Sequence, residues 1–91
     1  MTDTVRDNKA KHRFEVDVGD EVAVANYRLE PGAIALTHTE VPVSLQGQGI
    51  GSRLVRAVLE KIRADGLKVV PRCSFVSAYL ARHPEFNDLV Q

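Results

Sequence analysis

The chain has little cysteine, few aromatic residues and no tryptophan, and each shortage excludes a class of protein. One cysteine, Cys73, stands among 91 residues, so neither an intramolecular disulfide nor a zinc site built from several thiols can form. An aromatic content of 5% argues against a platform for stacking bases or sugars. We expect one small domain over residues 12–91, near the lower size limit for a single core, after a polar, flexible tail of residues 1–11.

An excess of charge and a long apolar run are also missing. Twelve basic residues balance twelve acidic ones, so no overall positive field attracts nucleic acid or anionic lipid. No apolar stretch approaches the roughly 20 residues of a membrane span, and the polar start MTDTVRDNKAK lacks the apolar region of a signal peptide. We therefore expect a cytoplasmic protein that binds neither nucleic acid nor membrane. The histidines and the cysteine show no metal-ligand spacing, so we expect no metal.

Alternating apolar and polar residues predict three antiparallel strands in the first half of the chain. The segment HRFEVDV (12–18) places its apolar residues on one face. A Gly-Asp turn leads to EVAVANYRL (21–29), in which Val22 and Val24 are the clearest apolar positions. The segment AIALTHTEV (33–41) is rich in β-branched residues and ends at a proline.

The second half predicts an amphipathic helix, a buried strand and a short helix. Apolar residues recur on one helical face from Ile50 to Ile62, and Asp65-Gly66 supplies a stop signal. Residues 67–76 are expected to form a strand, and 74–80 a short helix. The order β-β-β-α-β-α predicts an α+β fold. It would combine an antiparallel meander, a crossover helix, a strand parallel to the third strand and a short C-terminal helix.

Three glycines in five residues stand directly before the predicted long helix. The first N–H groups of a helix lack internal partners, and the helix dipole adds positive partial charge, so this turn suits an anion. The missing Cβ atoms let a pyrophosphate approach the N–H groups of Gly47, Gln48, Gly49, Ile50 and Gly51. A dinucleotide fingerprint does not fit, because the spacing is G-x-G-x-G and the nearest later acid, Asp65, ends the helix. A P-loop does not fit either, because no lysine follows the last glycine.

The run Gln46–Gly51 has the form Q-x-x-G-x-G between a strand and an amphipathic helix. It resembles the acetyl-coenzyme A pyrophosphate loop of the GNAT acetyltransferase superfamily. GAIALTHTEVP and GLKVVPRCSFVSAYLARHPEF resemble the short single-domain, GNAT-like branch, so the resemblance covers residues 12–90. It implies a GNAT-like fold, acetyl-coenzyme A as cosubstrate, and pantetheine against the backbone of 41–45. The implied cofactor-binding residues are Val41, Val43, Gln46, Gly47, Gln48, Gly49, Ile50, Gly51, Ser52 and Arg53.

Acetyl transfer to an amine needs a base, and His38 is the candidate. It lies on the strand before the loop, where many larger relatives place a carboxylate base, and an imidazole accepts a proton near neutral pH. With strict alternation Glu40 shares the face of His38, so it can orient the imidazole or accept the proton through water. A surface histidine without catalytic function is the simpler alternative.

Two further residues are catalytic candidates. The resemblance puts the acetyl group near Cys73, which can carry the acetyl group with His38 as its base or serve as a small apolar wall. Tyr79 is in the region where many larger relatives have a tyrosine that protonates the leaving thiolate. Here the surrounding motif departs from the family pattern, and a core aromatic is the alternative.

The leading hypothesis is an acetyl-coenzyme A-dependent N-acetyltransferase. The resemblance to the short branch implies a domain without the N-terminal elements that build the acceptor pocket of larger relatives, so we expect an open groove for a small amine or an exposed lysine on a protein or peptide. The alternative is a module that binds coenzyme A or its thioesters without turnover, and a weaker one is a purely structural domain. The first predicted strand has an exposed edge, so we expect a monomer or a weak homodimer.

Overall fold

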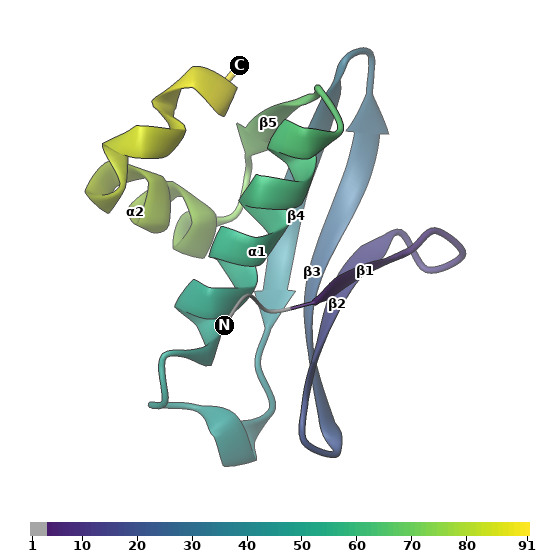
Figure 1. The fold of residues 1–91 in the computed structure, drawn as a ribbon, viewed down its shortest axis with the longest axis vertical. Coiled ribbons are helices and arrows are strands. Elements are labelled where there is room, and N and C mark those ends of the chain that lie inside the picture. Colours follow the sequence, from purple (N-terminus) through teal and green to yellow (C-terminus); the bar gives the residue numbers. More distant parts are fainter. Residues whose placement is uncertain (1–3) are drawn as a thin grey trace.

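The computed structural model describes residues 4–91, which form a five-stranded sheet with its helices packed on one side (Figure 1). Strands β1 to β4 pair antiparallel in sequence order, and β5 pairs parallel with β4. This arrangement confirms the predicted mixed sheet and the crossover helix. The elements are β1 (Val5–Asn8), β2 (Arg13–Val18), β3 (Glu21–Glu30), β4 (Ala33–Glu40), the 3-10 turn η1 (Val43–Leu45), α1 (Ile50–Ala64), β5 (Lys68–Pro71), α2 (Ser74–Arg82) and the 3-10 segment η2 (Pro84–Leu89).

The core lies between one face of the sheet and α1. The apolar positions of α1 recur at helical spacing, and burying this stripe against the strands is what keeps the helix in place. Its buried members are Ile50, Leu54, Val55, Ala57, Val58, Leu59 and Ile62. Residues of α2 and η2, including Val76, Tyr79 and Phe86, extend the same core cluster. We call the opposite side of the sheet, away from α1, the open face.

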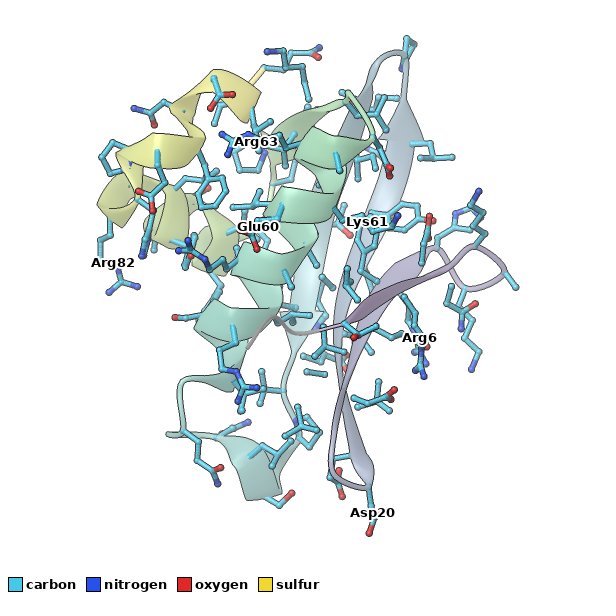
Figure 2. The ribbon with its side chains drawn as sticks, viewed as in Figure 1. Arg6, Asp20, Glu60, Lys61, Arg63 and Arg82 are labelled. Atoms are coloured by element: carbon cyan, nitrogen blue, oxygen red, sulfur yellow. The ribbon has the colours of Figure 1, made fainter. Side chains whose placement is uncertain are left out.

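The first strand corrects the predicted flexible tail. Residues 1–3 of that tail lie outside the described residues, but Val5–Asn8 forms β1 and pairs with β2. Polar contacts on the open face hold it. Arg6, labelled in Figure 2, donates hydrogen bonds to Glu15 (3.0 Å) and Asp17 (2.7 Å), and Asn8 donates one to Glu15. Apolar periodicity cannot reveal a strand stabilised in this way. The segment predicted to be an exposed edge, 12–18, is therefore covered by β1.

Glu15 is the buried charge of this network. Hydrogen bonds from the Arg13 guanidinium and from Asn8 lower the pKa of the Glu15 carboxyl to about 2, against the opposing effect of burial. The Nε of Arg13 lies 2.7 Å from the carboxylate. Glu15 therefore stays ionised throughout the physiological range.

The apolar face of β3 also differs from the prediction. The structure buries Ala23 and Ala25 in the core cluster; on the opposite face Val22 is 36% exposed, whereas Val24 is buried as expected but lies outside that cluster. The register explains this, because the two alanines lie beside the large side chains of Val16 and Phe14 on β2. Small residues next to large ones make room for α1, so size rather than hydrophobicity selected the inward positions.

Candidate functional site

The candidate site lies where β4 and β5 separate. The two strands pair from Ala33 with Lys68 to Leu36 with Pro71, and the last hydrogen bond runs from the Arg72 N–H to the Leu36 carbonyl (3.0 Å). β4 continues for four more residues, whereas the segment after β5 leaves the sheet and begins α2 at Ser74. The predicted strand 67–76 is thus shorter than expected, and the separation leaves one edge of β4 without a strand partner among residues 4–91.

The glycine loop closes one end of this separation. Gly47 (φ 83°) and Gly49 (φ 74°) adopt left-handed backbone conformations that are costly for residues with a Cβ. Arg53 is the first helical residue whose N–H bonds back, to the Gly49 carbonyl at 3.1 Å. The N–H groups of Ile50, Gly51 and Ser52 therefore have no helical partner, which makes this end of α1 suitable for an anion.

A groove of about 360 Å³ runs between the loop, the end of β4 and the start of α2. Seven of the ten predicted cofactor residues line it, whereas Val43, Gln48 and Arg53 do not. Thr39 and Phe75 also line it. The sequence does not indicate them, because they come next to the glycine loop only when the chain has folded. The lining residues are Thr39, Val41, Gln46, Gly47, Gly49, Ile50, Gly51, Ser52 and Phe75.

Two glutamines tie the loop to the preceding chain. The Gln46 side-chain amide donates to the Val41 carbonyl (3.1 Å), and the Gln48 amide donates to the Ser44 carbonyl (3.3 Å). Gln46 thus fixes the loop against the end of β4. Gln48 instead braces the turn that contains η1.

Phe75 gives the last glycine of the loop a packing role. If Gly51 carried a Cβ, this atom would lie 2.7 Å from the Cζ of Phe75. The ring is 39% exposed and lines the groove. A Cβ added at Gly47 or Gly49 would have no atom within 4 Å, so backbone conformation is the reason for glycine at these two positions. At Gly51 the reason is the nearby ring of Phe75.

A second hollow, of about 420 Å³, lies at the same strand end. It shares Thr39, Val41 and Gln46 with the groove, and it adds the candidate base. The Nε2 of His38 lies 3.2 Å from an Oε1 of Glu40, and both side chains are exposed, so the predicted shared face is confirmed. The lining residues are Val22, His38, Thr39, Glu40, Val41, Pro42, Val43 and Gln46.

A β-bulge in β4 sets which side chains face each hollow. Asn26 of β3 pairs with His38, whereas the next residue of β3 pairs with Leu36, so Thr37 is extra. Strict alternation from the buried Leu36 would turn His38 toward α1. With the bulge, His38 turns to the open face and Thr39 turns toward the groove. Sequence periodicity does not predict this exchange.

Cys73 lies on the groove side of β4. It precedes the first residue of α2, is 9% exposed, and has its Sγ 3.9 Å from the Oγ1 of Thr39. Since Thr39 and His38 lie on opposite faces of β4, the structure does not bring His38 and Cys73 together as a base and its nucleophile. Among the described residues, the polar neighbour of the thiol is the hydroxyl of Thr39.

Tyr79 lies in the core. It is 2% exposed, its ring stacks on His83 with centroids 3.8 Å apart, and it lines neither hollow. This placement matches the core-aromatic alternative.

Among residues 4–91, no group of three or more histidine, cysteine, aspartate or glutamate side chains is placed to hold a metal ion. No helix in this part of the chain has the length and apolar character needed to cross a membrane.

Comparisons with known proteins support the observed fold. A family model described as GCN5-related N-acetyl-transferase matches residues 13–89. Protein NATD1 of Gallus gallus and of Mus musculus is 33% identical over 51 residues, which is 56% of this chain and 46% of theirs. The chain thus spans about half the length of these relatives. A GCN5-like protein from Staphylococcus aureus, solved by NMR, superimposes with a TM-score of 0.72 at 28% identity, over 97% of this chain and 87% of its own.

Proposed function

The chain belongs to the GCN5-related N-acetyltransferase family, and from this premise we propose that it transfers an acetyl group from acetyl-coenzyme A to an amine. One observation carries the proposal. The groove beside the glycine loop and the hollow that holds His38 meet at the same residues, Thr39, Val41 and Gln46. A donor in the first and an acceptor in the second would therefore come together across the end of β4.

The residues of the groove fit coenzyme A. Left-handed glycines at 47 and 49 and the N–H groups of Ile50, Gly51 and Ser52 would hold the pyrophosphate. The unpaired edge of β4 up to Val41 would offer backbone groups to pantetheine. When bound, acetyl-coenzyme A supplies an acetyl group activated as a thioester. Ser52 lines the groove beside these N–H groups, and Arg53 adds positive charge in the same turn of α1.

His38 would act as the base. An ammonium ion cannot attack a carbonyl, so the imidazole first removes one of its protons, and the neighbouring Glu40 carboxylate stabilises the imidazolium that forms. The amine nitrogen then bonds to the acetyl carbon and the C–S bond breaks. A second proton from this nitrogen passes to the departing sulfur, and the imidazolium returns its proton to water, so protons balance over the cycle.

Cys73 would serve as a wall beside the reacting groups rather than as the base-assisted carrier. Its thiol lies next to Thr39 on the groove side, without the imidazole that a cysteine nucleophile uses. We assign Tyr79 no step, because its ring is stacked in the core.

The test begins with titration calorimetry of acetyl-coenzyme A, with NAD and ATP as controls, followed by release of coenzyme A thiol in the presence of an amine. We expect selective binding and amine-dependent release. We also expect His38→Ala to keep binding and to lose about 10²-fold or more in kcat. Intact-mass analysis of the protein and of Cys73→Ser should show no acetyl adduct on the cysteine.

Any other outcome of these measurements would change the assignment. Binding without amine-dependent release identifies a module that holds coenzyme A thioesters. An adduct that disappears in Cys73→Ser makes that cysteine the carrier. Absence of binding would overturn the assignment of the groove.

A further inference from the structure

The hollow that holds His38 has an apolar half. Val22 at the start of β3 and Pro42 and Val43 after β4 line it, and Val43 is 85% exposed. Exposed apolar side chains around a polar centre are typical of a surface that a partner covers.

Acidic residues lie in the hollow and beside it. Glu40 lines the hollow and is exposed, whereas Asp20 and Glu21 lie outside it, in and directly after the β2–β3 turn that precedes Val22. Neither Asp20 nor Glu21 makes an ion pair within the described part of the chain. Asp20 lies at the same end of the molecule as η1 (Figure 2). This end therefore attracts a cation, and electrostatic steering would act on a basic partner before contact.

An enclosed small molecule does not suit this hollow. Sites for small ligands bury most of the ligand within walls. Here the apolar groups lie on an exposed rim, and Val43 could be covered only by atoms well beyond a single amino group. The amine must therefore bring apolar neighbours of its own.

We propose that the acceptor is a lysine of another polypeptide, flanked by apolar residues. The inference rests on the proposed function and names its substrate class. The ε-amine enters between His38 and Glu40, a neighbouring apolar side chain covers Val22 and Val43, and the acidic turn favours further basic residues. The acetyl group passes to the ε-nitrogen with the bond and proton changes given above.

The test uses three acceptors with the full chain: a lysine peptide with leucine on both sides of the lysine, the same peptide with glycine on both sides, and n-butylamine. The kcat/KM for each is measured at saturating acetyl-coenzyme A. We expect the leucine-flanked peptide to exceed the glycine-flanked peptide by about fivefold or more, as one partly buried apolar contact implies. Butylamine should be the poorest acceptor.

Matched variants locate the preference. Val22→Ser, or Val43→Ser if the first variant folds poorly, should bring the two peptides to within about twofold of each other. Leu29→Ser is the control, because Leu29 is also an exposed apolar residue of β3 but does not line the hollow. It should keep the preference.

A second readout does not depend on turnover. Fluorescence anisotropy of the labelled peptides, with coenzyme A bound, should show the same order of affinity and the same effect of Val22→Ser. Equal affinities for the two peptides, or no change in Val22→Ser, would overturn the inference. If every amine is acetylated without preference, the inference fails and the proposed function stands. If none is acetylated although acetyl-coenzyme A binds, the proposed function fails, and anisotropy still decides whether the surface selects such peptides.

Discussion

Gly51 offers a sharp test of why the loop contains its glycines. Gly49 has a left-handed backbone, whereas only the ring of Phe75 opposes a side chain at 51. A Cβ there would lie 2.7 Å from the ring's Cζ and 3.3 Å from two further ring atoms. The ring must therefore retreat by about 0.7 Å to reach ordinary van der Waals contact. Because Phe75 lines the groove, the retreat alters the cofactor site.

The expected effect of Gly51→Ala on folding is small. Alanine improves helix propensity by up to about 1 kcal/mol over glycine, and moving a partly exposed ring costs a similar amount. The melting temperature should therefore change by less than about 4–8 °C. Binding should suffer more, and we expect the Kd for acetyl-coenzyme A to rise about tenfold, or about 1.4 kcal/mol.

A double-mutant cycle separates the ring from the ligand. Phe75→Ala removes the obstacle, so Gly51→Ala should have little further effect in that background, giving a coupling of about 1 kcal/mol or more. Gly49→Ala is the control, because its strain of about 1–2 kcal/mol comes from the backbone and Phe75→Ala cannot relieve it. Titration calorimetry and thermal denaturation measure both quantities. A tenfold loss for Gly51→Ala that persists without Phe75 would refute the reasoning and assign the glycine to close approach of the ligand.

Three further predictions concern the open face. Glu40→Gln should lower kcat about 10-fold or more with unchanged acetyl-coenzyme A affinity in calorimetry, because it leaves the imidazolium without its anion. Glu15 has a lowered pKa, so its stabilising effect is fully present above the unfolded pKa near 4.5 and is lost as pH falls toward 2. Glu15→Gln should therefore lower the melting temperature at pH 7 and flatten its acid decline. Asn26→Leu should leave stability in urea unchanged or raise it by about 1 kcal/mol, because the buried Asn26 Oδ1 has no hydrogen-bond partner in the described residues.

Local patterns determined much of the fold. The alternation of β2, the helical stripe of α1 and the stop at Gly66 (φ 73°) are visible in the sequence because each depends on residues a few positions apart. The same holds for the glycine loop, because glycine at positions 47 and 49 by itself indicates a left-handed backbone conformation. His38 and Glu40 share a face because two residues along a strand return to the same side.

The contacts between distant segments decided the rest. β1 is held by hydrogen bonds to Glu15 on the adjacent strand β2. The inward positions of β3 depend on the size of Phe14, also on β2. The bulge at Thr37 arises from pairing with β3, and it turns His38 to the face of β4 opposite Thr39, whose hydroxyl lies beside Cys73. Phe75 meets Gly51 only because α2 returns beside α1. Periodicity reports which face of an element is apolar, but the neighbour against which that face packs is fixed only when the whole chain has folded.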